Sequence, residues 1–306
     1  MSRVYSPANS RISRLLVRLA DMNKPLTSSG KLHLEQFRKL VHNATGIKLP
    51  VSKDLMIESR LRRRLVTLNM PDLDTYLGNL FSAPDALKAE LPEIIDLMTT
   101  NKTDFFREQA HYRIVAERLV PEALNRAAPG QSVRYKVWSA ASSTGAEAWS
   151  AAMVLAEYAR KDPRLDWAIM GTDISRRVID TARKAIYCSS ELAPVPRQMR
   201  DAYLMSGRES VSERARIVPE LRARVRFAEL NLMDDHYDID RGLDLIFLRN
   251  VLIYFEPEVQ ARVIRRISTH LRRHGYLIVG HSESMMVRQP GLLQVAPGVF
   301  RNDGGD

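Results

Sequence analysis

One stretch of the sequence decides the fold: Val137-Trp138-Ser139-Ala140-Ala141-Ser142-Ser143-Thr144-Gly145-Ala146-Glu147. Apolar residues suited to a strand come first, a turn of small residues follows, and a helical pattern then runs over residues 144–158. Small side chains let a ligand approach the backbone, and a helix N-terminus offers free N–H groups and partial positive charge. The stretch has neither a G-x-G-x-x-G pattern nor a P-loop lysine. It therefore predicts a strand–turn–helix unit suited to the carboxylate end of an amino acid.

Strands and helices alternate on both sides of this unit. We expect further strands over residues 167–170, 227–230, 243–248 and 276–279, and helices over 175–186 and 257–271. Such alternation predicts parallel strands joined by right-handed crossovers in a layered α/β domain. Residues 188–225 break it with a stretch rich in proline, arginine and serine, which predicts a small inserted subdomain.

The N-terminal part has only helical patterns. They predict helices over residues 32–41, 52–68 and 73–81, and a short helix that Pro92 opens and that ends near Met98. The apolar side of the second helix is expected to carry Leu55, Ile57, Leu61, Leu65 and Leu68. We predict a flexible basic extension at 1–30, a helical domain at 31–127 and an α/β domain at 128–306, with the inserted subdomain at about 188–225.

The amino-acid composition limits the class of protein to which this chain can belong. Of the 306 residues, 45% are hydrophobic and 27% charged, which is typical of a globular protein. The single cysteine, Cys188, excludes a disulfide or cysteine–zinc framework within one chain. No apolar run approaches the roughly 20 residues of a membrane span, so we expect a cytoplasmic protein without membrane insertion.

The net charge and the spacing of the histidines indicate which partners and metals the protein is expected to bind. The net charge of +10 favours an acidic partner. Because the basic clusters are not interleaved with aromatic residues and no base-reading motif is present, we expect no nucleic-acid partner. We see no metal-ligand spacing around His111, His270 or His274, so no metal site is expected.

Polar residues follow four of the predicted strands. Glu147 lies in the first turn of a helix, where it either complements the helix dipole or binds a ligand ammonium group. Asp173 either caps a helix, a role that Ser175 can also fill, or accepts hydrogen bonds from ribose hydroxyls. Asn231 and the pair Arg249-Asn250 follow two other strands. Because ligands of open α/β sheets bind outside the carboxyl ends of the strands, this pattern indicates a nucleoside-bearing amino acid such as S-adenosylmethionine.

At this point the sequence resembles the chemotaxis receptor methyltransferase family, CheR. The resemblance covers nearly all of the chain from about residue 32 and follows the family's order. It is carried by Asn-x-Thr-x-Phe-Phe-Arg at 101–107, Trp138-Ser139-Ala140 with Ser143-Thr144-Gly145 and Glu147, Gly171-Thr172-Asp173-Ile174, Leu230-Asn231-Leu232-Met233-Asp234, Arg-Asn-Val-x-Ile-Tyr-Phe at 249–255, and Gly-His-Ser-Glu-Ser at 280–284.

The resemblance implies a small all-helical N-terminal domain and a Rossmann-like S-adenosylmethionine-dependent methyltransferase domain with an inserted β-subdomain that helps to tether receptors. It implies that Arg107 and Tyr254 lie nearest the transferred methyl group. Residues implied to line the cofactor pocket are Asn101, Thr103, Arg107, Glu147, Asp173, Asn231, Leu232, Arg249 and Asn250. The sequence departs from the family's first motif at Ala141, Ser142, Ala146, Ala148 and Trp149.

The implied reaction is methyl transfer to glutamate side chains of chemotaxis receptors, which gives γ-glutamyl methyl esters and S-adenosylhomocysteine. The expected partners are the acidic cytoplasmic helices of methyl-accepting receptors. We expect the protein to be a monomer that is recruited to receptor arrays. The arginines Arg60, Arg62, Arg63 and Arg64 are either a docking face for these helices or a solvated helix face. Two alternatives stay open: a cofactor-binding signalling module without turnover, and a methyltransferase of this fold acting on another substrate.

Overall fold

The structure is a computed structural model that describes residues 25–206 and 213–304. The chain divides into two compact units, residues 1–99 and residues 100–306. Residues 1–24, most of the predicted extension, lie outside the described residues, whereas Ser28 to Gly30 already belong to a helix.

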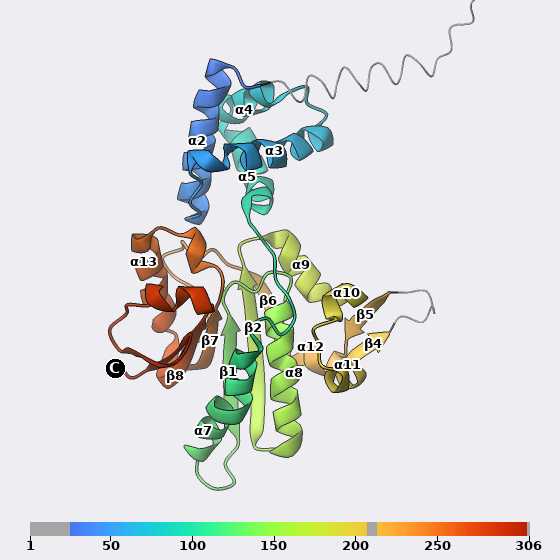
Figure 1. Cartoon of the computed structure of the whole chain (residues 1–306), viewed down its shortest axis with the longest axis vertical. Coiled ribbons are helices and arrows are strands. Elements are labelled where there is room, and N and C mark those ends of the chain that lie inside the picture. Colours follow the sequence, from blue (N-terminus) through green and yellow to red (C-terminus); the bar gives the residue numbers. More distant parts are fainter. Residues whose placement is uncertain (1–24, 207–212, 305–306) are drawn as a thin grey trace, which may run out of the picture. The chain divides into compact units, whose positions relative to one another are not determined.

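The first unit is all-helical in its described part (Figure 1). Its helical elements are α2 (Ser28–Thr45), η1 (Val51–Lys53), α3 (Asp54–Leu68), α4 (Leu73–Ser82) and α5 (Pro84–Met98). The apolar stripes meet in one core that includes Phe37, Ile57, Leu61, Leu65 and Leu77. Gly46 ends α2 in the left-handed conformation that glycine adopts readily.

Two details of the helical prediction are corrected. Pro84 opens α5, and Pro92 lies inside this helix rather than at the start of a separate one. Pro92 is exposed, so water can satisfy the carbonyl group that its missing N–H leaves free, while buried Ile94 and Met98 hold the helix on the core. Leu55 is 83% exposed. It precedes Ile57 by two residues, which at about 100° per residue turns it to the opposite face.

The second unit is built on a seven-stranded sheet in the order β6-β2-β1-β7-β8-β10-β9. The first five strands in this order are parallel, and β10 is antiparallel to both β8 and β9. The strands are β1 (Val133–Ser139), β2 (Leu165–Asp173), β6 (Val225–Glu229), β7 (Leu243–Leu248), β8 (Leu271–Val279), β9 (Leu292–Ala296) and β10 (Val299–Asn302). All six residues of β7 are buried, as its apolar run predicted for a central parallel strand.

Helices and short turns connect these strands. They are α6 (Gln109–Ile114), η2 (Val115–Leu119), α7 (Val120–Asn125), α8 (Ala146–Lys161), α9 (Arg176–Lys184), η3 (Leu252–Tyr254), α13 (Pro257–Ser268) and η4 (His281–Met286). Figure 1 shows α8 running alongside β1 and β2. The layered α/β architecture expected from the alternation is therefore confirmed.

A second, three-stranded antiparallel sheet interrupts the chain between β2 and β6. Its order is β3-β5-β4, formed by β3 (Ile186–Cys188), β4 (Leu204–Ser206) and β5 (Arg214–Ile217). It is accompanied by α10 (Ser189–Leu192), α11 (Arg197–Tyr203) and α12 (Pro219–Arg224). This is the segment in which the broken alternation predicted an inserted subdomain, and its β-structure is what the family resemblance implied.

The boundary between the units is also corrected. It lies between Thr99 and Thr100 rather than near residues 127–131. The helical segment α6–α7 belongs to the second unit because Leu119, Val120 and Leu124 are buried in the same core as Tyr135 of β1. Its helical pattern made it look like a continuation of the N-terminal domain.

Gly145, in the turn that opens α8, allows the packing of this turn against its neighbours to be tested. It has a φ of 89°, and an added Cβ would meet the Cβ of Ala182 at 2.9 Å and the Trp149 Nε1 at 3.0 Å. We expect Gly145→Ala to lower the free energy of unfolding by about 2–5 kcal/mol, through backbone strain and overpacking together. Gly130→Ala is the matched control, because Gly130 has a φ of 77° with nothing within 4 Å of an added Cβ. It should cost only about 1 kcal/mol in urea unfolding; equal costs would contradict the packing argument.

Candidate cofactor-binding site

The carboxyl ends of four strands meet at one edge of the sheet. Ser139 at the end of β1 pairs with Gly171 of β2 and with Phe247 of β7, and Asp173 pairs with Glu229 of β6. The loops that follow these strands therefore leave the sheet side by side. Asp173 ends β2, and the loops contain Asn231, Arg249 and Asn250, so the expected convergence of polar strand ends is present.

The turn after β1 is tied to Asp173. The Asp173 carboxylate accepts hydrogen bonds from the backbone N–H of Ser143 at 2.9 Å and of Ser175 at 3.0 Å. Ser175 itself caps α9, which decides between the two capping candidates. Asp173 is only 8% exposed. These two bonds orient the carboxylate at the end of β2, and its contact with ribose hydroxyls stays a prediction.

Glu147 and Arg249 form the buried centre of the site. Glu147 accepts a hydrogen bond from the Ser139 hydroxyl at 2.7 Å and one from Arg249 Nη1 at 3.1 Å. The guanidinium of Arg249 also donates to the Tyr112 hydroxyl, the Arg107 carbonyl oxygen and Glu108 Oε2. The Arg249 side chain is 2% exposed. One arginine therefore joins the end of β7 to α8 and to residues 107–112.

The charges of this centre depend on one another. Burial alone would lower the pKa of Arg249, but Glu147, Tyr112 and Glu108 outweigh it and raise the pKa. Burial raises the pKa of Glu147 against the opposing charge of Arg249. Burial also raises the pKa of Glu108, but the charge and hydrogen bond of Arg249 lower it by more, so the net shift of this pKa is downward. Arg249 is thus held charged between two carboxylates.

Residues 101–108 lie over the turn after β1. The Asn101 carbonyl oxygen accepts a hydrogen bond from the Ser143 hydroxyl at 2.8 Å, and the Phe106 N–H donates to the Ser150 hydroxyl at 2.9 Å. Phe106 and Glu108 have φ values of 53° and 57°, in the left-handed region that residues with side chains seldom adopt. This backbone brackets Arg107, whose half-buried side chain donates to the Lys102 carbonyl oxygen at 3.4 Å. Strain of this kind is typical of functional sites.

The loop after β7 is fixed by a buried carboxylate. Glu283, which is fully buried, accepts hydrogen bonds from the N–H groups of Asn250 at 2.7 Å, Gly280 at 2.8 Å and Ile253 at 3.3 Å. Asn250 has a φ of 57°. This clamp sets the path of residues 250–254, and hence the place of half-buried Tyr254 at the end of η3. Among the described contacts, none joins Tyr254 to Arg107.

The remaining predicted residues complete the rim. The Asn231 side-chain oxygen accepts a hydrogen bond from the Met233 N–H at 3.0 Å, which turns the loop after β6. Leu232 is buried, and its carbonyl oxygen accepts from the Tyr237 hydroxyl at 2.7 Å. Thr103 is half-buried within the segment over the turn. Their contact with a cofactor stays a prediction.

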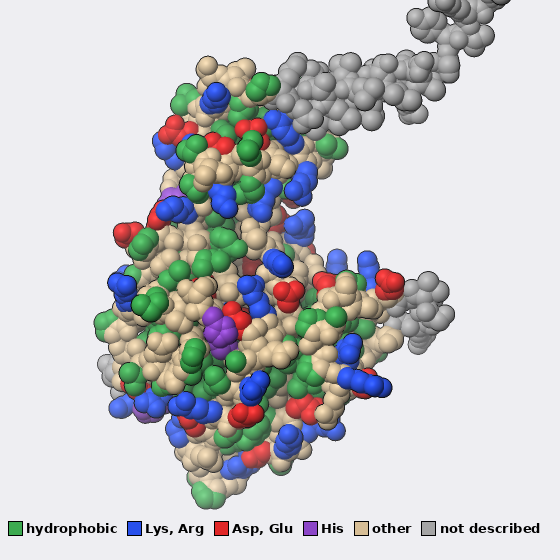
Figure 2. All heavy atoms as spheres, viewed as in Figure 1, with side chains coloured by type: hydrophobic (Ala, Val, Ile, Leu, Met, Phe, Trp, Pro, Cys, Tyr) green, Lys and Arg blue, Asp and Glu red, His purple; other side chains and the backbone are tan. Residues whose placement is uncertain are grey.

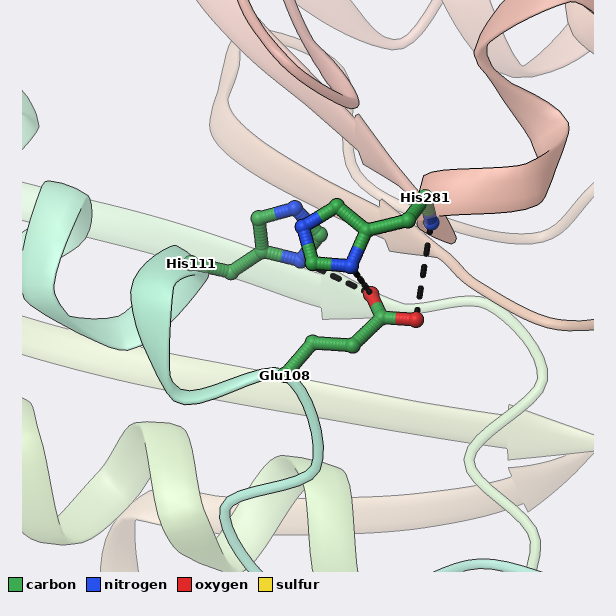
Figure 3. Close-up of side chains that lie close together, drawn as sticks. All are labelled: Glu108, His111 and His281. Atoms are coloured by element: carbon green, nitrogen blue, oxygen red, sulfur yellow. Dashed lines mark hydrogen bonds and ion pairs between the residues drawn. The ribbon is translucent and has the colours of Figure 1, made fainter.

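Sequence reasoning missed several members of this site. Glu108, Tyr112 and Glu283 had no assigned role, although Glu108 directly follows one quoted motif and Glu283 lies within another. Sequence spacing also did not reveal that His111 lies beside Glu108 and His281 (Figure 3). His281 is 170 residues away from His111 in the chain, so only the fold could reveal this group. Burial and then the charge of Arg249 lower the pKa of His111 to about 4, so the ring is neutral at pH 7.

The arginines of α3 do not form one free cluster. Arg60 donates to the carbonyl oxygens of Leu97 and Thr99, Arg62 pairs with Glu58, and Arg64 makes two hydrogen bonds to Glu90. Arg63 is the exposed member. On the face viewed in Figure 2, basic and acidic side chains are interspersed rather than gathered by sign.

Comparison with known protein families decides the assignment. Residues 101–299 match the CheR methyltransferase SAM-binding domain, and residues 32–99 match the CheR methyltransferase all-alpha domain. The chain belongs to the CheR methyltransferase family. It is an S-adenosylmethionine-dependent methyltransferase with a Rossmann-like catalytic domain, and the resemblance of its motifs is confirmed.

Several relatives are similar to this CheR family member over most of their length. The chemotaxis protein methyltransferase of Escherichia coli is 36% identical over 82% of this chain and 84% of its own. The chemotaxis protein methyltransferase of Salmonella typhimurium is 36% identical over 85% of this chain and 87% of its own. The Borreliella burgdorferi protein of the same name is 32% identical over 89% and 95%. In the described part of this chain, no helix has the length and apolar character needed to cross a membrane.

Removal of the central arginine tests the charge balance. Arg249→Met leaves the buried carboxylate of Glu147 and the half-buried one of Glu108 without their shared counter-ion, so we expect the free energy of unfolding to fall by about 3–5 kcal/mol. Chemical denaturation without cofactor measures this. The control is Arg176→Met, since Arg176 and Glu229 form an exposed pair at 3.6 Å that should contribute no more than about 1 kcal/mol. Similar losses in both variants would show that Arg249 is not a central contact.

Proposed function

We propose that this CheR family member methylates glutamate side chains of chemotaxis receptors and forms γ-glutamyl methyl esters. The observation that carries the proposal is the arrangement around Arg249. Its guanidinium ties the cofactor edge of the sheet to the backbone of Arg107, while the Arg107 side chain stays half-buried and faces no carboxylate of the described residues. An available guanidinium next to a methyl donor site suits a carboxylate substrate.

The chemistry asks little of the protein. When bound, S-adenosylmethionine supplies an electrophilic methyl group on its sulfonium. A glutamate carboxylate has a pKa near 4.3 and is ionised at neutral pH, so no general base is needed. The protein has to exclude water and hold the carboxylate in line with the methyl group.

Arg107 and Tyr254 are the proposed orienting groups. Transfer neutralises the attacking carboxylate, so a tight ion pair to Arg107 would stabilise the ground state more than the transition state. We therefore assign to Arg107 the orientation of the carboxylate, and to Tyr254 a hydrogen bond near the sulfur or the carboxylate. Glu147, Asp173, Asn231 and Asn250 are proposed to hold the cofactor, together with Asn101, Thr103, Leu232 and Arg249.

The proposed function is tested with labelled S-adenosylmethionine and the cytoplasmic fragment of a cognate receptor. We expect label on the receptor that base releases as methanol, since carboxyl methyl esters are base-labile. Base-stable label would indicate another acceptor. Tight cofactor binding with no transfer would favour the signalling-module alternative.

The orienting role predicts a specific kinetic defect. Arg107→Ala should lower kcat by at least about tenfold at saturating receptor, because the carboxylate loses its alignment. The affinity for S-adenosylhomocysteine, measured by calorimetry, should change by no more than a few-fold. Arg113→Ala removes an exposed arginine from the neighbouring helix α6 and serves as the control. Normal turnover of the Arg107→Ala variant would contradict the role.

Receptor docking is proposed for the exposed side of α3. Because Arg60, Arg62 and Arg64 have partners within the helical unit, Arg63 is the arginine best placed to meet an acidic helix. Exposed Leu55 and Val66 lie on the same helix and add apolar surface. The inserted β-subdomain is proposed to help tether receptors, as the family resemblance implies.

Charge reversal tests this docking surface. Arg63→Glu should raise the apparent KM for the receptor several-fold at low salt, with less difference at high salt because exposed charges are screened. Lys88→Glu makes the same change of charge at an exposed position of α5 and is the control. If both variants raise KM equally, net charge rather than docking at Arg63 is responsible.

A further inference from the structure

A group of potential metal ligands lies beside the cofactor site and takes no part in the proposed reaction. Glu108 and His111 come from the start of α6, and His281 opens η4 (Figure 3). One donor atom from each lies within 4.8 Å of the other two. Among the described residues, no other trio of histidine, cysteine or acidic side chains meets that distance.

The distances suit tetrahedral coordination. His111 Nδ1 lies 3.3 Å from Glu108 Oε2, and His281 Nδ1 lies 3.6 Å from the same oxygen. Ligand bonds of 2.0–2.1 Å at tetrahedral angles give edges of about 3.4 Å between donor atoms. Two edges of the trio are therefore close to the required length before any side chain moves.

The tautomer of His111 directs a lone pair into the group. His111 is fully buried, and its Nε2 lies 3.3 Å from the carbonyl oxygen of Pro297. A carbonyl oxygen only accepts, whereas Nδ1 makes no hydrogen bond although it lies 3.3 Å from Glu108 Oε2, so the geometry favours the tautomer with the proton on Nε2 and the lone pair on Nδ1. His111 Nδ1 has no hydrogen-bond partner. Metal-binding histidines are held in this way, with the second ring nitrogen donating to a carbonyl group.

The surroundings hold the other ligands as well. Glu108 Oε1 accepts a hydrogen bond from the backbone N–H of His281 at 3.4 Å, which turns Oε2 toward the two rings. The turn at Gly298 packs against His111, since an added Cβ there would meet Nε2 at 3.0 Å. The His281 side chain is 49% exposed. A fourth coordination position would therefore open toward solvent.

Arg249 is the competing cation. Its Nη2 donates to Glu108 Oε2 at 3.2 Å. A metal ion on this oxygen would weaken that bond, but Arg249 would keep Glu147, the Tyr112 hydroxyl and the Arg107 carbonyl oxygen. Glu147 continues to balance its charge. The competition lowers the affinity of the site without dismantling the centre around Arg249.

We propose that Glu108, His111 and His281 bind a divalent transition-metal ion of the zinc class. Two imidazole nitrogens and one carboxylate oxygen suit Zn²⁺, and the three donors leave the fourth position for water. The ion would tie the start of α6 to the start of η4. It plays no part in methyl transfer.

Direct metal binding tests the proposal. The full chain, freed of metal with a chelator and titrated with Zn²⁺ in a calorimeter, should bind one equivalent and show a Tm that rises with free Zn²⁺. His281→Ala should lose at least tenfold in affinity together with the rise in Tm. Glu108→Gln keeps the size of the side chain and should show the same loss, so a folding defect in one variant does not decide the result.

Two controls separate this site from other ligands. His274→Ala removes a histidine that is 42% exposed and lies beside Asp303, and Cys188→Ser removes the one thiol. Both variants should bind Zn²⁺ as the unaltered chain does. Unchanged binding in His281→Ala and Glu108→Gln, or no binding in the unaltered chain, would overturn the proposal.

Discussion

The site depends on one buried arginine held between two carboxylates. Arg249 leaves the end of β7 and meets Glu147 from α8 and Glu108 from the segment before α6. Taking three charges out of water is costly, and their mutual attraction compensates only while every partner is present. The same guanidinium bonds the Arg107 carbonyl oxygen and the Tyr112 hydroxyl. Elements far apart in the chain thus become one wall of the cofactor site.

In this arrangement the residues at the strand ends are distinct from Arg107, the residue proposed to orient the substrate. The residues around the strand ends are engaged with one another, so the protein's own contacts hold this edge of the sheet in place. Arg107 has a fixed backbone and a side chain bonded to a carbonyl oxygen of its own segment. The proposed reaction has a nucleophile that is already ionised, so it would need alignment more than proton transfer. A fixed backbone with an adaptable guanidinium meets that requirement.

Much of this could be predicted where neighbours in sequence are also neighbours in space. The apolar run Leu243–Leu248 predicted β7 at its exact bounds, and the small-residue turn predicted the unit from β1 to α8. The antiparallel pair β9 and β10 was missed because its short strands carry few buried residues. The interactions of Arg249 with Glu108, and of Glu283 with Asn250, were missed because residues distant in the chain make them. Pro92 was wrongly placed at a helix start, because α5 continues through it and buried Ile94 and Met98 compensate for the lost hydrogen bond and the steric clash of an interior proline.

The positive charge of Arg249 balances the carboxylates of Glu147 and Glu108. A double-mutant cycle of Arg249→Met with Glu147→Gln tests this claim. The quantity measured is the free energy of unfolding. In the unaltered chain, Glu147→Gln should destabilise, because Arg249 loses a charged partner. In the Arg249→Met background the same substitution should stabilise, because it neutralises a buried carboxylate that has no counter-ion. An equal loss in both backgrounds, within about 0.5 kcal/mol, would contradict the claim.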